Sequence, residues 1–163
     1  AGGVMAGEHI VSLLGGKGKV VELEGIAGTS AARDRGQGFN DAIAGTEIEV
    51  VAKQVADFDR TQGLSVMENI LQAQPEIDAV FAHNDEMALG AQKAIEASGR
   101  EIIIVGFDAT DDAVAAVKEG KMSATVAQQP SLIGELGVET AKKILDGESV
   151  EDFVPVDLQL VTE

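Results

Sequence analysis

Side chains that could hold a small polar ligand recur at one kind of place in this chain, shortly after runs rich in β-branched residues. The set contains a guanidinium, a carboxylate, two carboxamides, an aromatic ring and an aliphatic side chain. A neutral sugar requires this mixture, because each hydroxyl donates and accepts hydrogen bonds while the apolar ring face can lie on an aromatic side chain. In chain order the candidates are Ile26, Arg35, Phe58, Asn84, Asp108 and Gln128.

Each candidate also has a purely structural interpretation. Asn84 and Asp108 precede expected helices, where either would serve as an N-cap. Phe58 fits a core position, and Gln128 fits a turn before a proline. Arg35 fits such an interpretation least well, because a cation in the first turns of a helix opposes the macrodipole. Taken jointly, the positions favour a binding site over separate structural roles.

Motifs for other chemistries are incomplete. Residues 25–30 form a glycine loop without the lysine and spacing of a triphosphate site, and residues 36–38 lie within a helical pattern, where a dinucleotide fingerprint does not occur. Asp57, Asp59, Thr61 and Glu68 match a calcium loop, but Gln62 occupies the position that requires glycine. The two histidines lack the spacing of a helix-borne zinc site. We therefore expect no metal, cofactor or catalysis.

The elements that would position the candidates alternate between strands and helices. Runs rich in β-branched residues predict strands at 19–23, 48–55, 79–82, 102–107 and 123–127, with a last extended run at 153–161. Apolar residues at helical spacing predict helices near 4–14, 32–43, 64–74, 87–98, 113–119 and 131–145.

This alternation, with short connections, predicts an α/β fold of the flavodoxin-like class. Right-handed crossovers would build an open parallel sheet with helices on both faces. Residues 102–107 are apolar throughout, as expected of a strand that is covered on both sides. Ligands bind such sheets outside the carboxyl ends of the strands, and the candidates all fall there.

Length and charge exclude several classes of protein. The chain has 163 residues, which fits a single domain, and its net charge of −16 would repel a nucleic acid or an anionic membrane surface. No uninterrupted apolar run is long enough for membrane insertion. There is no cysteine, and the opening residues AGGVMAGEHI contain no initiator methionine and no basic stretch before an apolar segment. We therefore expect no signal peptide within these residues.

Several longer motifs resemble those of ribose-binding proteins, the periplasmic receptors of bacterial ATP-binding-cassette (ABC) sugar transporters. They are LEGIAGTSAARDRGQGF, ADFDRTQGLSVMENILQAQP, FAHNDEMALGA, VGFDAT and SATVAQQP. Family members have two flavodoxin-like lobes that close on one sugar, and residues 1–163 resemble the carboxyl-terminal lobe alone. The resemblance implies a periplasmic or extracellular location and docking to an ABC transporter permease.

The resemblance also implies roles for particular residues. Arg35, Asn84, Asp108 and Gln128 match the polar ribose ligands of this lobe, and Phe58 matches an aromatic residue that packs on the sugar. Ile26 and Phe107 would border the site. The chain departs from the family at His83, where glutamine is expected, and at Ala109, where glycine is usual. A side chain at Ala109 could shift the backbone that positions Asp108.

In the family, the helix within 131–150 packs on the other lobe. We therefore expect this helix to fold onto its own sheet, to pair with a second copy as a homodimer, or to leave an apolar face in water. Half a cleft predicts weak binding of ribose or a related pentose. Three alternatives remain: the effector domain of a lac-repressor-type regulator, a small enzyme using Asp57, Asp59 or Asp108, and an engineered scaffold that no longer binds.

Overall fold

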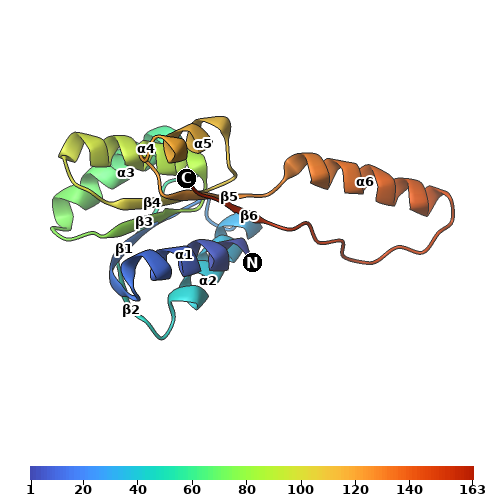
Figure 1. The fold of residues 1–163 in the computed structure, drawn as a ribbon, viewed down its shortest axis with the longest axis horizontal. Coiled ribbons are helices and arrows are strands. Elements are labelled where there is room, and N and C mark those ends of the chain that lie inside the picture. The colour runs from blue at the N-terminus through green and yellow to red at the C-terminus, as the bar shows by residue number, and fades with distance from the viewer.

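The computed structural model describes all residues, 1–163, as one sheet with helices on both faces and one projecting helical arm (Figure 1). Strands and helices alternate along the whole chain. Their bounds are α1 Gly2–Leu14, β1 Lys17–Glu24, α2 Ser30–Ile43, β2 Glu47–Val55, α3 Arg60–Ala73, β3 Ala79–Ala82, α4 Asp85–Ser98, β4 Ile103–Phe107, α5 Asp111–Lys118, β5 Ala124–Ala127, α6 Pro130–Leu145 and β6 Gln159–Val161.

The sheet has the strand order β2-β1-β3-β4-β5-β6, and the first five of these strands are parallel. The predicted α/β class and parallel sheet are therefore confirmed. The last element differs from the expectation: only Gln159–Val161 of the extended run 153–161 forms a strand, and it pairs antiparallel with β5. Three residues carry too little periodicity to show their direction in a sequence.

Alternation along β1 shows how the sheet is buried on both faces. Val20 joins the core beneath α1 and α2, whereas Val21 and Leu23 join the core beneath α3, α4 and α5. All three side chains are fully buried. Glu22 is buried as well, although it is charged, so it requires partners inside the protein.

Local signals account for the helix ends. Thr29 accepts a hydrogen bond from the backbone N–H of Ala32 at the start of α2, and Asp59 accepts one from Gln62 at the start of α3. Gly15 ends α1 in the left-handed region, with φ 64°. Since Asp59 caps a helix that contains Thr61 and Glu68, these residues form a helix start rather than a calcium loop.

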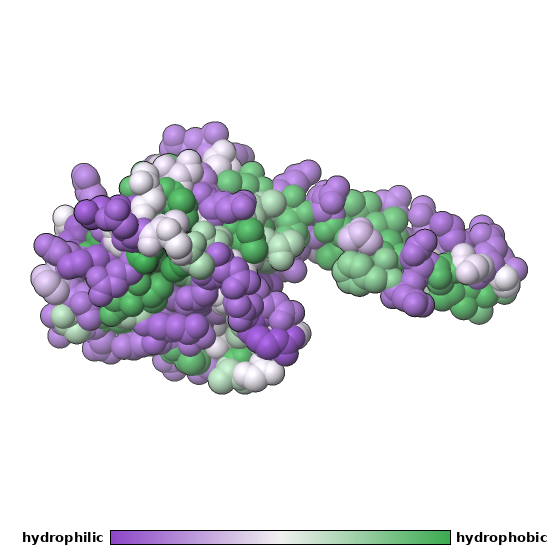
Figure 2. Space-filling model, turned by 90° about the horizontal axis from the view of Figure 1, so that it is seen from below, coloured by the Kyte–Doolittle hydropathy of each residue, from purple (hydrophilic) through white to green (hydrophobic).

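Helix α6 forms an arm that extends away from the sheet (Figure 1). None of its residues is buried; Val138 is 73% exposed and Leu145 is 86% exposed. Hydrophobic surface is visible along the arm in Figure 2. At its base, the Gln129 side chain donates to the carbonyl of Asp157 over 2.6 Å, which joins the outgoing and returning segments. Of the three expected arrangements, the single chain shows an apolar face in water. No helix is both long and apolar enough to cross a membrane.

Candidate functional site

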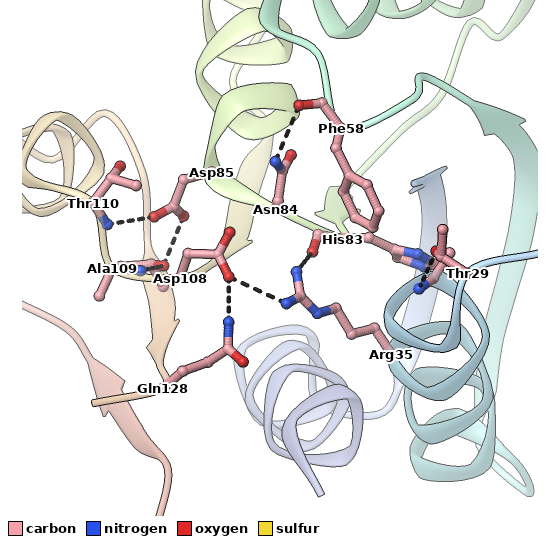
Figure 3. Close-up of polar contacts among 12 residues, drawn as sticks. Thr29, Arg35, Phe58, His83, Asn84, Asp85, Asp108, Ala109, Thr110 and Gln128 are labelled. Carbon is pink, nitrogen blue, oxygen red and sulfur yellow. Dashed lines mark hydrogen bonds and ion pairs between the residues drawn. The ribbon is translucent and has the colours of Figure 1, made fainter. Parts of the chain in front are cut away.

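The polar candidates meet at the carboxyl edge of the sheet, as Figure 3 shows. Asp108 follows β4, Gln128 follows β5, and Arg35 reaches this edge from α2. The Arg35 Nη2 lies 3.2 Å from Asp108 Oδ1, and Gln128 Nε2 donates to the same oxygen over 2.6 Å. We call this group of three side chains the polar triad. The carboxylate at its centre is thus held from two sides.

The guanidinium of Arg35 is held by more than its ion pair. Its Nη1 donates to the backbone carbonyl of His83. The Arg35 Cζ atom lies 3.9 Å from the centroid of the Phe107 ring and 5.7 Å from that of Phe58, both within cation–π range. The side chain is only 13% exposed, and this burial lowers its pKa while the charge of Asp108 opposes the shift. These contacts explain why a cation stands on α2 despite the macrodipole.

The triad leaves hydrogen-bonding capacity facing the solvent. Asp108 Oδ2 and Gln128 Oε1 make no hydrogen bond within the protein. The other polar atom of each side chain does: Gln128 Nε2 and Arg35 Nη2 both donate to Asp108 Oδ1. Burial raises the pKa of Asp108, and the nearby Arg35 charge and the Gln128 hydrogen bond oppose this without cancelling it. Two fixed acceptors therefore stand beside a guanidinium that has further N–H groups to donate.

Asp108 stands on a strained loop. Asp108 and Ala109 have φ values of 111° and 52°, a region that favours glycine. The loop is tied down by Asp85: its Oδ2 accepts from the Thr110 N–H over 2.7 Å, and its Oδ1 accepts from the Thr125 hydroxyl over 2.7 Å. Thr125 in turn accepts from the Ala109 N–H over 3.1 Å. Asp85 therefore positions Asp108 without reaching the solvent itself.

The aromatic side of the site is built on Phe58 and Asn84. The Asn84 side chain caps α4 by accepting from the Met87 N–H, and its Nδ2 donates to the Phe58 carbonyl over 3.2 Å. The cap interpretation of Asn84 is thus confirmed, and one amide N–H and one lone pair remain for a ligand. For Asp108 the cap interpretation is wrong, because Thr110 caps α5.

The remaining two candidates lie at different depths. Ile26 is 47% exposed at the outer margin of the site. Phe107 is buried in the core beneath Arg35, so it touches the site only through the guanidinium. The structure thus brings Arg35, Asp108 and Gln128 into direct contact, places Phe58 beside them, and leaves Ile26 at the edge.

Three buried polar residues support this site, and the sequence did not identify their roles. They are Glu22, His83 and Asp85, all fully buried. A charged residue within the apolar run of β1 was a signal for an internal partner at Glu22. Asp85 gave no such signal, because an acidic residue in the first turn of a helix is ordinary.

Other parts of the surface have fewer free groups that could bind a ligand. A hollow of about 670 Å³ lies at the opposite edge of the sheet, beside Ile103 and Arg100. The Arg100 guanidinium there donates to the carbonyls of Leu71 and Gln74, so it already has structural partners. The structure contains no group of three or more His, Cys, Asp or Glu residues that could hold a metal ion.

The sequence is similar to a known family over most of its length. Residues 1–149 match the family described as the periplasmic binding protein domain. The ribose import binding protein RbsB of Haemophilus influenzae is 60% identical over 163 residues, which cover 100% of this chain and 56% of that protein. RbsB of Bacillus subtilis is 56% identical over 162 residues, 99% of this chain and 53% of that protein. The chain thus spans about half the length of these relatives.

Solved structures agree with this likeness. A periplasmic solute binding protein of an ABC transporter from Actinobacillus succinogenes, with bound D-allose, superposes with a TM-score of 0.95 at 35% identity, over 99% of this chain and 57% of that one. A solute binding protein from Bacillus halodurans, with bound myo-inositol, gives a TM-score of 0.92 at 40% identity, also over 99% and 57%.

Proposed function

The chain belongs to the periplasmic binding protein domain family, and from this premise we propose that its carboxyl-edge rim binds a small neutral sugar without converting it. Ribose or a related pentose is the ligand that we favour. The proposed ligand-binding side chains are Arg35, Phe58, Asn84, Asp108 and Gln128, with Ile26 at the margin and Phe107 supporting Arg35.

One observation carries this proposal: the polar triad presents fixed and unsatisfied acceptors beside a fixed donor. Asp108 Oδ2 and Gln128 Oε1 are free, and Arg35 is held in place by Phe107 and the His83 carbonyl. Vicinal hydroxyls of a sugar need acceptors and donors at neighbouring positions. A charge-assisted hydrogen bond to a carboxylate is also stronger than one between neutral groups. The arrangement therefore suits a cyclic polyol.

The names of the relatives support the choice of ligand class. RbsB proteins are described as ribose import binding proteins, and the two solved relatives contain D-allose and myo-inositol. All three ligands are small, uncharged and rich in hydroxyls. Ribose is the leading candidate because the RbsB proteins are the relatives of higher identity.

We propose that these residues alone bind the sugar weakly. The rim is open, so one face of the sugar stays in water and its hydrogen bonds compete with solvent, which limits each to about 1 kcal/mol. A typical small-molecule site instead buries most of its ligand. We expect a dissociation constant of about 1 mM or weaker, on the order of −4 kcal/mol.

The exposed arm formed by α6 is the basis for a proposal about a protein partner. We propose that its apolar residues, which include Ile133, Ile144 and Leu145, are covered by a second copy of the chain at high concentration. By family resemblance, the helix within 131–150 would otherwise pack on a second lobe. Docking to the permease of an ABC transporter is a further proposal that rests on the family alone.

The test of sugar binding is a ribose titration of ¹⁵N-labelled protein, followed by backbone amide shifts. We expect saturable shifts at Ile26, Phe58, Asn84, Asp108 and Gln128, and their loss in Asp108→Ala. Small uniform shifts that persist in Asp108→Ala would contradict the proposal and leave a folded scaffold that does not bind.

The second candidate is the effector domain of a lac-repressor-type regulator. The family match favours a receptor, and a net charge of −16 does not suit a DNA-bound protein. An enzyme using Asp57, Asp59 or Asp108 has less support, because Asp59 is occupied as a helix cap and Asp108 is held by Arg35 and Gln128. Turnover of any pentose or pentose phosphate would revive that alternative.

A further inference from the structure

The histidine that departs from the family pattern is buried between two parts of the site. His83 follows β3, is fully buried, and its Nε2 lies 2.9 Å from Glu22 Oε1. Its Nδ1 lies 3.3 Å from the backbone nitrogen of Gly25. A backbone N–H can only donate, so Nδ1 must be unprotonated here. The ring proton is therefore on Nε2 and is donated to Glu22.

The carboxylate that receives this proton is itself fixed. Glu22 Oε2 accepts from Asn40 Nδ2 over 3.0 Å and lies 3.3 Å from Lys53 Nζ. Burial alone would raise the pKa of Glu22, but the hydrogen bonds from His83 and Asn40 and the charge of Lys53 lower it below its ordinary value. Glu22 is thus an anion with a fixed position, and it holds the His83 ring in one tautomer and one orientation.

The His83 ring and the His83 carbonyl are each linked to the binding rim, the ring through Gly25 and the carbonyl through Arg35. The ring accepts from the N–H of Gly25, and the Phe58 ring lies against Gly25 so closely that a Cβ there would come within 2.0 Å of it. The His83 carbonyl accepts from Arg35. Figure 3 shows His83 between Phe58 and Arg35. The aromatic and cationic sides of the rim therefore meet at this residue.

We propose that His83 is a positioning residue for sugar recognition: its Nε2–H tautomer fixes Gly25, and through Gly25 the Phe58 ring, relative to Arg35. This inference rests on the proposed function of the rim. Space for the ring is left by Gly36 on α2, where a Cβ would lie 3.1 Å from His83 Cε1. Gly25, Glu22 and Gly36 thus surround the His83 ring and fix its orientation.

A glutamine can replace this histidine in its hydrogen bonds. The carboxamide offers one acceptor for Gly25 and one donor for Glu22, as the Nε2–H imidazole does. A leucine of similar volume offers neither group, so a comparison of the two variants separates the hydrogen bonds from the filling of space.

The first experiment needs no sugar. Long-range ¹H–¹⁵N spectra of the wild-type protein should show His83 as the Nε2–H tautomer at pH 7.5. Exchange of the Gly25 amide proton should be slow in the wild type and in His83→Gln, and faster in His83→Leu, which fills a similar volume without hydrogen bonds. An Nδ1–H tautomer, or equal Gly25 exchange in all three proteins, would overturn the inference.

The second experiment repeats the ribose titration with these variants and with His9→Gln, a control that removes the other histidine. We expect His83→Gln and His9→Gln to stay within about twofold of the wild type, and His83→Leu to bind about fivefold more weakly, as expected for one lost hydrogen bond. The lost shifts should be those of Ile26 and Phe58, while Asp108 and Gln128 still respond.

Rescue by the conservative variant separates positioning from general structural support. Because His83→Gln keeps an acceptor for Gly25 and a donor for Glu22, its Gly25 exchange rate and its Phe58 response to ribose should match those of the wild type. A folded His83→Gln protein that exchanges Gly25 quickly and loses the Phe58 response would overturn the inference, and this comparison remains decisive if His83→Leu does not fold. If the wild type shows no response to ribose, the proposed function fails, whereas the tautomer and the Gly25 exchange rates still test His83.

Discussion

The buried carboxylate of Asp85 should make the stability of the chain fall as the pH rises, and Asp85→Asn should remove that dependence. In the variant, the carboxamide oxygen can accept from the Thr110 N–H while its NH₂ group donates to Thr125 Oγ1. The shape and both contacts are kept, although the Thr125 hydrogen bond reverses its direction, and the titratable group is lost. The strained loop of Asp108 therefore remains anchored.

The size of the effect follows from the pKa of Asp85. Burial raises this pKa from the ordinary 3.8 to about 6, against the opposing hydrogen bonds from Thr125 and Thr110. As the pH rises, the unfolded chain loses the Asp85 proton first, so the stability is fully present below pH 3.8 and is lost as the pH rises through 6. The whole shift corresponds to about 3 kcal/mol, of which about 2 kcal/mol falls between pH 4.5 and 7.5.

The assay is urea unfolding followed by far-ultraviolet circular dichroism, since the chain contains no tryptophan or tyrosine. The free energy of unfolding of the wild type, minus that of Asp85→Asn, should fall by about 2 kcal/mol from pH 4.5 to pH 7.5. Asp152→Asn, at an exposed position in the segment that follows α6, controls for the loss of one negative charge. A difference that does not change with pH would refute the reasoning.

Four further outcomes are expected. Gly25→Ala should displace the Phe58 ring, because a Cβ at this position would lie 2.0 Å from the Phe58 Cζ atom. We expect weaker ribose binding and a free energy of unfolding in urea that is lower by about 1–3 kcal/mol. Unchanged values would contradict the close packing of Phe58 on Gly25. Ala109→Gly should raise the free energy of unfolding by up to about 1 kcal/mol by relieving a left-handed φ, whereas a loss would show that this backbone is unstrained. Sedimentation should detect a dimer at millimolar concentration that Leu145→Glu weakens; a strict monomer would refute the role of the arm. Added salt should raise the melting temperature near neutral pH, because the net charge is −16; no change would mean that the charges are already well paired.

The sequence predicted the parallel sheet and its site edge because both depend on short-range patterns. Arg35 illustrates this, since its conflict with the helix macrodipole was visible without any partner, and Asp108 and the His83 carbonyl then supplied the reason. Asn84 likewise could be recognised as a helix cap, because it caps α4 through a contact only three residues away. Such signals are contained within one turn or one strand.

Long-range pairing accounts for what the sequence could not show. Asp85 bonds to Thr110 and Thr125, 25 and 40 residues away, and Glu22 bonds to His83 across 61 residues. No local pattern links such residues. The same limit applies to the arm: the apolar face of α6 was evident from its spacing, but its projection away from the sheet depends on tertiary contacts.

The most direct test of sugar recognition at this rim is a search for intermolecular nuclear Overhauser effects between ribose and the Phe58 ring. The aromatic region of the spectrum is sparse, with five phenylalanines, two histidines and no tyrosine or tryptophan, so Phe58→Leu would assign the ring signals. We predict contacts from ribose protons to the Phe58 ring that disappear in Asp108→Ala. Contacts to other rings alone, or contacts to Phe58 that survive in Asp108→Ala, would contradict the account.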